Sequence, residues 1–139
     1  MRKLLCVILS VVMVLATSVC GFGAVKPGDG AVSPQYVATN RVSAQISIVT
    51  GVSVYSAKAY AKTADSIDYI KATLKLVDSK GNVVKTKTET VYESGGYFKI
   101  TDTKALSSKG TYHAEYTLKV YKSGSLVETI KGQSDTAKY

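Results

Sequence analysis

The residues that could perform nucleophilic, acid–base or metal chemistry are few in this chain and lie far apart. Cys6 and Cys20, the two cysteines, stand in or at the edge of an apolar N-terminal run, so the rest of the chain offers no thiol. His113, the single histidine, faces outward on an expected strand and has no cysteine or convincing serine partner. One imidazole without cysteine is also too little for a zinc site. We therefore expect no catalytic residue, no metal and no cofactor.

The acidic residues give no stronger pattern. Asp65 and Asp68 are three residues apart in an expected loop, and their spacing does not indicate a hydrolase pair. The segment 78–82 (Asp-Ser-Lys-Gly-Asn) has a lysine inside it and lacks the downstream ligands of a calcium loop, so it predicts a hairpin turn. No glycine-rich loop leads from a strand into a helix, as nucleotide binding would need. A hydrolase therefore ranks third among the candidate functions, after the two non-enzymatic functions given below.

The N-terminus has the layout of a secretory signal peptide. Arg2 and Lys3 precede the uncharged apolar run 4–20, and small residues follow at 21, 23 and 24. We expect residues 1–23 to be a signal peptide and the protein to be secreted, either extracellular or associated with the cell envelope. An uncleaved membrane anchor is the first alternative. A lipoprotein acylated at Cys20 is the second, although Thr17 and Val19 do not fit the residues usual before such a cysteine.

The charge of the chain is basic but dispersed. The chain of 139 residues has 18 Lys and Arg against 10 Asp and Glu, a net charge of +8. Without Arg2 and Lys3 the balance is 16 against 10, or +6. Charged side chains on a solvent-facing sheet explain this pattern. Attraction of the protein to an anionic surface is the more specific interpretation. We do not expect a secreted domain to bind nucleic acid. We expect it to associate with a membrane only if the signal segment stays uncleaved.

Beyond the N-terminus, apolar residues recur with a period of two. Residues 24–40 contain both prolines and read as a flexible lead-in to a domain at 41–139. Alternation predicts strands near 41–49, 52–62, 67–77, 83–92, 98–100, 112–120 and 126–134. The fourth has lysines on one face and threonines on the other, which is typical of an edge strand. Ten tyrosines and many β-branched residues supply enough apolar surface for one core.

Seven short strands with turns between them predict an all-β fold, an antiparallel β-sandwich of the immunoglobulin-like type. The segment Gly110-Thr111-Tyr112 has the form of the tyrosine corner at the start of strand F in such domains. Ala114 then stands where immunoglobulin domains place their second cysteine. The chain has no Trp to mark strand C, so the prediction is of immunoglobulin-like architecture only.

Three segments resemble a known group of proteins. The segment 33–48 (Ser-Pro-Gln-Tyr-Val-Ala-Thr-Asn-Arg-Val-Ser-Ala-Gln-Ile-Ser-Ile) resembles the opening of small exported proteins of clostridia and related Gram-positive bacteria. The segments 109–112 and 119–129 resemble their last hairpin. That group is a domain of unknown function, so the resemblance implies an exported all-β protein of a Gram-positive bacterium and transfers no catalytic residue.

The tyrosines are the remaining functional signal. Tyr55, Tyr112 and Tyr116 fall on inward faces and are expected in the core. A flat ring with a polar tip, beside a lysine, can stack on sugars or form a protein interface. The candidate binding residues are therefore Tyr60, Tyr69, Tyr97, Tyr121, Lys58 and Lys119. The expected function is non-enzymatic binding of an anionic glycan, wall polymer or extracellular protein. A small secreted effector resembling a bacteriocin is the alternative.

Overall fold

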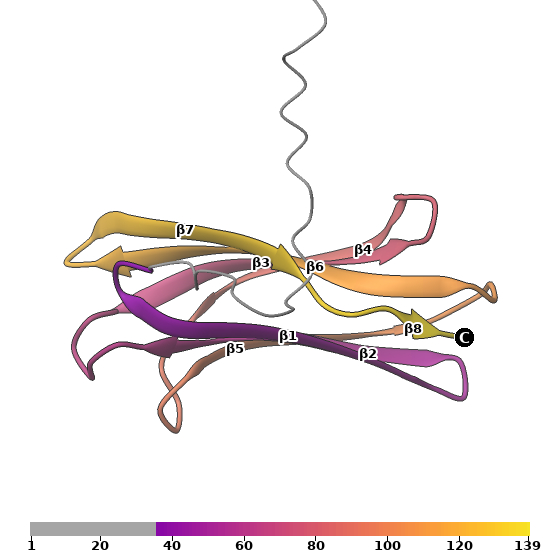
Figure 1. Ribbon diagram of the computed structural model, residues 1–139, viewed down its shortest axis with the longest axis horizontal. Coiled ribbons are helices and arrows are strands. Elements are labelled where there is room, and N and C mark those ends of the chain that lie inside the picture. Colours follow the sequence, from indigo (N-terminus) through magenta and orange to yellow (C-terminus); the bar gives the residue numbers. More distant parts are fainter. Residues whose placement is uncertain (1–35) are drawn as a thin grey trace, which may run out of the picture. The chain divides into compact units, whose positions relative to one another are not determined.

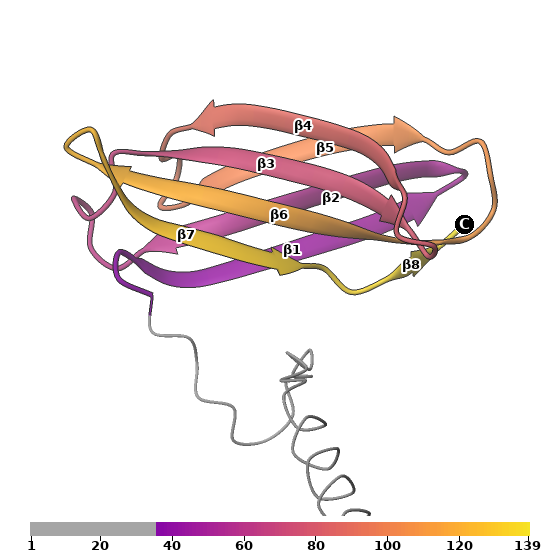
Figure 2. The same ribbon diagram turned by 90° about the horizontal axis from the view of Figure 1, so that it is seen from above.

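The computed structural model describes residues 36–139, which form two antiparallel β-sheets packed face to face (Figure 1). The first sheet has the order β1 (Thr39–Val49), β2 (Val52–Ala61), β5 (Phe98–Ala105). The second has the order β4 (Val83–Val91), β3 (Tyr69–Asp78), β6 (Thr111–Lys122), β7 (Ser125–Gln133), and β8 (Ala137–Lys138) pairs with the start of β6 (Figure 2). The all-β sandwich is thus confirmed. The signal peptide and most of the lead-in lie outside the described residues.

The strand positions predicted from alternation agree with the structure, and most strand ends differ by no more than two residues. Three differences are informative. The strand near residue 100 continues to Ala105, because it pairs with β2 as far as Val52. β1 begins at Thr39, two residues before the expected start, because its first residues are held by a side chain of β7. β8 has two residues, too few to show any periodicity in the sequence.

The core lies between the sheets and is built from the alternating positions. The inward side chains of β3, Ile70, Ala72, Leu74 and Leu76, are completely buried. Tyr55 of β2 and Phe98 of β5 are the largest side chains that are almost completely buried. The outward positions of β3 are mainly polar, whereas those of β2 include the exposed Val52 and Val54, so the division into an apolar and a polar face is clearest in β3.

The hairpin turns follow from residues that accept a positive φ. Thr50 and Gly51 (φ 47° and 79°) form the two-residue β1–β2 turn, and Ser123 and Gly124 (φ 49° and 76°) form the β6–β7 turn. Positive φ at both central positions is the type I′ geometry that suits two-residue hairpins. In the β3–β4 turn, Gly81 (φ 85°) donates its N–H to the Asp78 carbonyl at 3.0 Å, as the segment 78–82 predicted.

One open side of the sandwich, between β1 and β7, is closed by Glu128. Its carboxylate accepts hydrogen bonds from the backbone N–H groups of Val37 (2.9 Å), Ala38 (3.3 Å) and Thr39 (3.3 Å), and from the Thr39 hydroxyl (3.1 Å). Ala38 and Thr39 are buried, so water cannot replace this carboxylate without cost. A single side chain of the second sheet therefore fixes the start of the first.

Replacing Glu128 with Ala is expected to lower the free energy of unfolding by about 2 kcal/mol, because buried N–H groups lose their acceptor. Glu128→Gln keeps one acceptor oxygen and should cost less. Urea denaturation of both variants measures the difference. A Glu128→Ala variant as stable as the wild type would show that the carboxylate does not hold this edge.

The opposite open side, between β4 and β5, is bridged by hydrogen bonds from inward-pointing lysines. Lys85 donates to the Asp102 carboxylate (2.8 Å) and to the Thr103 carbonyl (2.9 Å), and Lys87 donates to the Thr101 carbonyl (2.9 Å). These carbonyls belong to β5, which is one of the two edge strands of the first sheet. The lysines thus cover the free edge of β5, and a charged edge strand resists pairing with another chain.

Candidate functional site: two tyrosine and lysine clusters

The candidate tyrosines gather at one end of the sandwich, on the outer faces of both sheets. Tyr60 is near the end of β2, Tyr69 begins β3, Tyr97 precedes β5 and Tyr121 is near the end of β6. All four lie at the end that is on the left in Figure 2, where β4 and β6 end and β3 and β5 begin. The six predicted candidates divide between two faces: Tyr60, Tyr97 and Lys58 on the first sheet, and Tyr69, Tyr121 and Lys119 on the second.

On the first sheet, a cluster is formed by Arg41, Lys58, Tyr60 and Tyr97 and is called the first-sheet cluster below. The rings of Tyr60 and Tyr97 are tilted by 50° with centroids 5.9 Å apart. The Arg41 guanidinium lies 4.6 Å from the centre of the Tyr60 ring, and the Lys58 ammonium lies 5.1 Å from that of Tyr97. Each ring is thus paired with a cation of its own sheet.

On the second sheet, the second-sheet cluster consists of Tyr69, Lys71, Tyr92, Lys119 and Tyr121. Tyr69 and Tyr121 are cross-strand partners, and their rings stack at 4.8 Å with an angle of 11°. Tyr92 lies against Tyr69 at 6.2 Å and is 67% exposed, the most exposed tyrosine described. The Lys71 ammonium lies 5.2 Å from the centre of the Tyr121 ring.

Two members of the second-sheet cluster carry like charges side by side. Lys71 of β3 pairs in register with Lys119 of β6, and both side chains are exposed. Directly opposed residues of an antiparallel pair have Cβ atoms about 5 Å apart, and like charges there are unfavourable. Within the described part of the chain, neither lysine forms an ion pair. Lys58 and Lys99 oppose each other in the same way on the first sheet.

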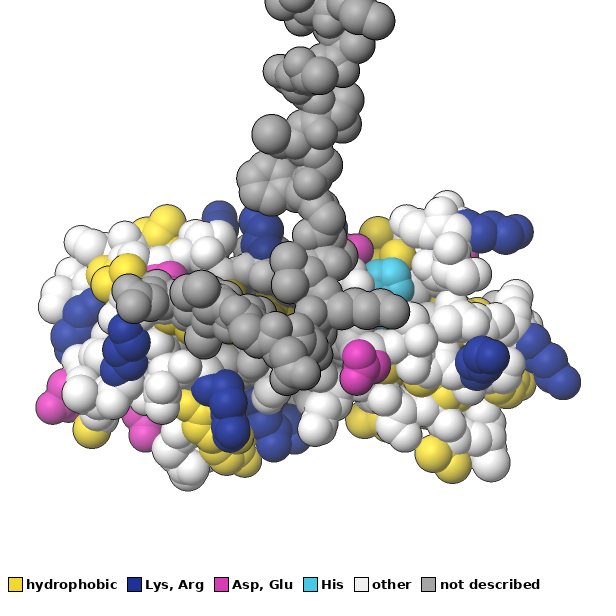
Figure 3. All heavy atoms as spheres, viewed as in Figure 1, with side chains coloured by type: hydrophobic (Ala, Val, Ile, Leu, Met, Phe, Trp, Pro, Cys, Tyr) yellow, Lys and Arg dark blue, Asp and Glu magenta, His cyan; other side chains and the backbone are white. Residues whose placement is uncertain are grey.

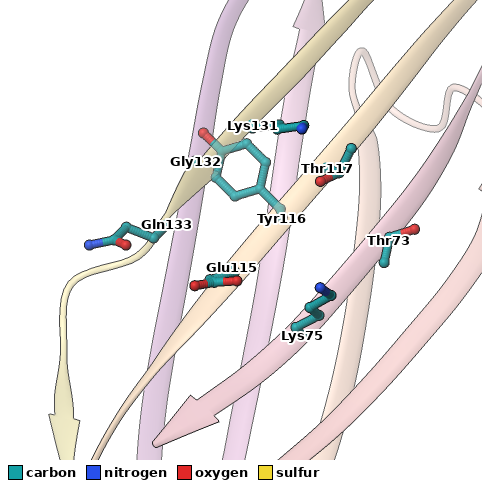
Figure 4. A pocket seen from close by; sticks show the side chains of 8 residues that line it. All are labelled: Thr73, Lys75, Glu115, Tyr116, Thr117, Lys131, Gly132 and Gln133. Carbon is teal, nitrogen blue, oxygen red and sulfur yellow. The ribbon is translucent and has the colours of Figure 1, made fainter. Parts of the chain in front are cut away.

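A shallow groove of about 280 Å³ lies beside this cluster, on the outer face of the second sheet (Figure 4). Its sides are outward residues of β3, β6 and β7, and Tyr116 and Gly132 lie at its base. Figure 4 shows the Tyr116 ring next to Gly132, which has no side chain to fill the space. The lining residues are Thr73, Lys75, Glu115, Tyr116, Thr117, Lys131, Gly132 and Gln133. Ammonium, hydroxyl and amide groups and one carboxylate, that of Glu115, therefore surround the groove.

The glycine at the base of the groove is required by its tyrosine partner. A Cβ atom on Gly132 would lie 2.4 Å from the Tyr116 hydroxyl oxygen and 2.6 Å from the ring carbon that bears it. Burial raises the pKa of the Tyr116 phenol, with a further contribution from Tyr36. The ring packs against the core between β6 and β7.

Gly132→Ala is accordingly expected to cost about 1–3 kcal/mol of stability, since the Tyr116 ring must move. In a Tyr116→Leu background the same substitution should cost less than about 0.5 kcal/mol, and thermal unfolding of the four proteins in this cycle gives both numbers. Equal costs in the two backgrounds would mean that the ring does not need the glycine.

The other titratable candidates serve the fold or stand apart. His113 lies on the outward face of β6, and its Nε2 is 3.5 Å from a Glu115 carboxylate oxygen. Asp68 accepts hydrogen bonds from Lys122 (2.9 Å) and the Ser123 N–H, and the first of these chiefly lowers its pKa. In residues 36–139 no three His, Cys, Asp or Glu side chains gather as metal ligands. No helix in this range is long and apolar enough to cross a membrane.

The three residues expected to be structural are near the start of β6. The Tyr112 side chain is buried, and its hydroxyl donates to the Ser108 carbonyl at 2.7 Å. Gly110 exchanges backbone hydrogen bonds with Tyr139. Ala114 is completely buried, and its N–H donates to the Ser134 hydroxyl at 2.9 Å. A tyrosine hydroxyl bonded to the backbone a few residues upstream is the contact that a tyrosine corner makes.

Sequence reasoning missed three members of the clusters, Arg41, Lys71 and Tyr92. Alternation within the third expected strand puts Lys71 on an outward position, whereas neither face of the fourth expected strand is strongly apolar, so the sequence does not orient Tyr92. Only the register between strands places Arg41 beside Tyr60 and Lys71 beside Lys119. No protein-family model and no curated protein matches the chain.

Proposed function

We propose that this protein is an exported, non-enzymatic binding module that acts at the surface of a Gram-positive bacterium. Its ligand is an anionic glycan, a wall polymer or an extracellular protein. The observation that supports binding is the gathering of half-buried tyrosines, and the exposed Tyr92, with lysines at one end of the sandwich. The signal-peptide pattern of residues 1–23 supports export.

The sandwich belongs, in this proposal, to the immunoglobulin-like type. β1, β2 and β5 take the places of strands A, B and E, and β3, β6 and β7 those of strands C, F and G. β4 joins the second sheet beside β3, as strand C′ does in variable domains. The contact from the Tyr112 hydroxyl to the Ser108 carbonyl lies at the start of the strand that corresponds to F.

Binding is favoured over catalysis because the perturbed acidic and phenolic groups are used by the fold. Asp102 holds Tyr55 and Lys85 between the sheets, and Asp78 is satisfied within its own turn. The basic side chains are spread over the surface rather than gathered in a cleft, as the dark blue side chains in Figure 3 show for one face. Such a surface attracts anions at long range.

Co-sedimentation of the purified protein with Gram-positive cell wall, at low and at high salt, tests binding. We expect the protein to pellet with the wall at both salt concentrations, with weaker binding at high salt because surface charges are screened. Binding that vanishes completely at high salt would mean that the net positive charge alone is responsible for the interaction. No binding at either concentration would overturn the proposal and favour the diffusible effector.

A further inference from the structure

We propose that the outer face of the second sheet binds an acidic polysaccharide, whose acid groups lie between Lys71 and Lys119 while a sugar ring stacks on Tyr92. This inference rests on the proposed function and names its site and the chemical class of its ligand.

The opposed lysines are the first observation that carries it. Lys71 and Lys119 repel each other across β3 and β6, and no carboxylate of the described chain pairs with either. Like charges in directly opposed positions depart from the usual cross-strand pairing, here as at Lys58 and Lys99. A carboxylate, sulfate or phosphate between the ammonium groups of Lys71 and Lys119 removes the repulsion and forms two charge-assisted hydrogen bonds.

The rest of the face suits a linear anionic polymer. The outward positions of β3, β6 and β7 bear four lysines and a single carboxylate, that of Glu115; the lysines are Lys71, Lys75, Lys119 and Lys131. Between the lysines lie threonine hydroxyls, and the Thr73 and Thr88 hydroxyl oxygens are 3.1 Å apart. From Tyr69 to Lys75 the strand runs about 20 Å, so tyrosines, lysines and groove form one continuous track.

The aromatic end of the track distinguishes a sugar polymer from a simple polyanion. Tyr92 is 67% exposed, and within residues 36–139 no cation lies over its ring. Its flat apolar face and hydroxyl tip are therefore open to a sugar ring. A polymer without rings could use the lysines but would gain nothing from Tyr92.

The first-sheet cluster is the weaker candidate although its composition is similar. Arg41 lies over the ring of Tyr60 and Lys58 over that of Tyr97, so each half-buried ring already has a cationic partner. Lys58 and Lys99 are opposed across β2 and β5 as Lys71 and Lys119 are across β3 and β6.

Titration calorimetry of the full chain, at one ionic strength, compares three probes. Polygalacturonate offers acid groups on sugar rings, polyacrylate offers acid groups without rings, and dextran offers rings without charge. We expect polygalacturonate to bind most tightly and dextran to show no binding. The double variant Lys71→Gln/Lys119→Gln should lose about tenfold or more in affinity for polygalacturonate, since two charge-assisted contacts disappear.

The double variant Lys99→Gln/Lys109→Gln removes the same number of charges from exposed lysines outside both clusters and should stay within about twofold of the wild type. Tyr92→Ser should weaken binding of polygalacturonate several-fold and leave binding of polyacrylate unchanged. Circular dichroism of each variant checks that the fold is kept, and all five substituted side chains are exposed.

Three results would overturn the inference. Equal losses of affinity in the two lysine double variants would mean that net charge alone explains the binding. Equal affinities for polyacrylate and polygalacturonate would mean that sugar rings do not contribute to it. No binding of polygalacturonate would exclude the ligand class. If wall co-sedimentation persists in these cases, the proposed function stands and only the site or ligand is wrong; if it is absent as well, both fail.

Discussion

Replacing Tyr112 with Ala is expected to lower the free energy of unfolding by about 3–5 kcal/mol. The side chain is 6% exposed and packs in the core, so its loss leaves a large cavity between the sheets. The hydroxyl also bonds to the Ser108 carbonyl at 2.7 Å and so fixes the connection between β5 and β6. Guanidinium denaturation of wild type and variant gives the difference directly.

The conservative variant Tyr112→Phe separates the two contributions. It keeps the ring and loses only the hydrogen bond, so we expect a loss of about 1 kcal/mol. A loss below about 1 kcal/mol for Tyr112→Ala itself is the range of exposed substitutions and would contradict the buried corner.

Asp102→Ala should destabilise the protein by about 2–3 kcal/mol at neutral pH. One carboxylate oxygen accepts from Lys85 (2.8 Å) and the Thr103 N–H (2.9 Å), and the other accepts from the Tyr55 hydroxyl (3.0 Å). The Tyr55 side chain is 1% exposed, so its hydroxyl would be left without a partner in the core. Lys85 is partly exposed and can recover water, which keeps the expected loss at the low end for a broken buried pair.

The loss at Asp102 should depend on pH in a defined direction. Burial acts to raise the pKa of this carboxyl, but the hydrogen bonds from Lys85, Thr103 and Tyr55 outweigh it and the pKa is lowered. A lowered pKa in the folded state gives stability that is present above the unfolded value, about 3.9, and lost as the pH falls through the folded value. The difference between wild type and Asp102→Ala should therefore shrink below about pH 4.

Tyr55 should make the free energy of unfolding depend on pH in the alkaline range. Burial, with the hydrogen bond and negative charge of Asp102, raises the pKa of its phenol. Its contribution is thus present below the unfolded value, about 10, and is lost as the pH rises through the folded value. Urea denaturation from pH 3 to pH 11 measures the onset of both losses.

Lys85→Met is the matched control for this network, because it removes one partner and leaves the Tyr55 and Thr103 bonds in place. It should cost about 1 kcal/mol or less, as expected for a partly exposed ion pair. If Asp102→Ala cost no more than Lys85→Met, or cost the same at pH 3 and pH 7, the carboxylate would not hold the sheets as described.

Alternation along the chain predicts most of this fold, because the side-chain period of a strand is a local property. The inward set of β3, from Ile70 to Leu76, and the turn around Gly81 can be read without any knowledge of partners. The contacts that close the sandwich cannot be predicted in this way. Glu128 meets Thr39, and Asp102 meets Lys85, only after the two sheets have packed with particular edges adjacent.

The candidate site divides in the same way. The sequence shows that Tyr60 and Tyr69 face outward, but it does not show that they belong to different sheets. Sheet membership depends on the crossing from β2 to β3, and the opposition of Lys71 and Lys119 depends on the register of β3 with β6. The tyrosines could therefore be named from sequence, and the faces on which they lie could not.

The location and N-terminus of the full chain, expressed in a Gram-positive host, test the proposal of an exported surface module most directly. Cells are separated into cytosol, membrane, wall and medium, and the intact mass of the protein in each fraction is measured. We expect protein in the wall fraction with its N-terminus at Ala24. Protein that keeps Met1 and stays in the cytosol, or processed protein found entirely in the medium, would contradict the proposal.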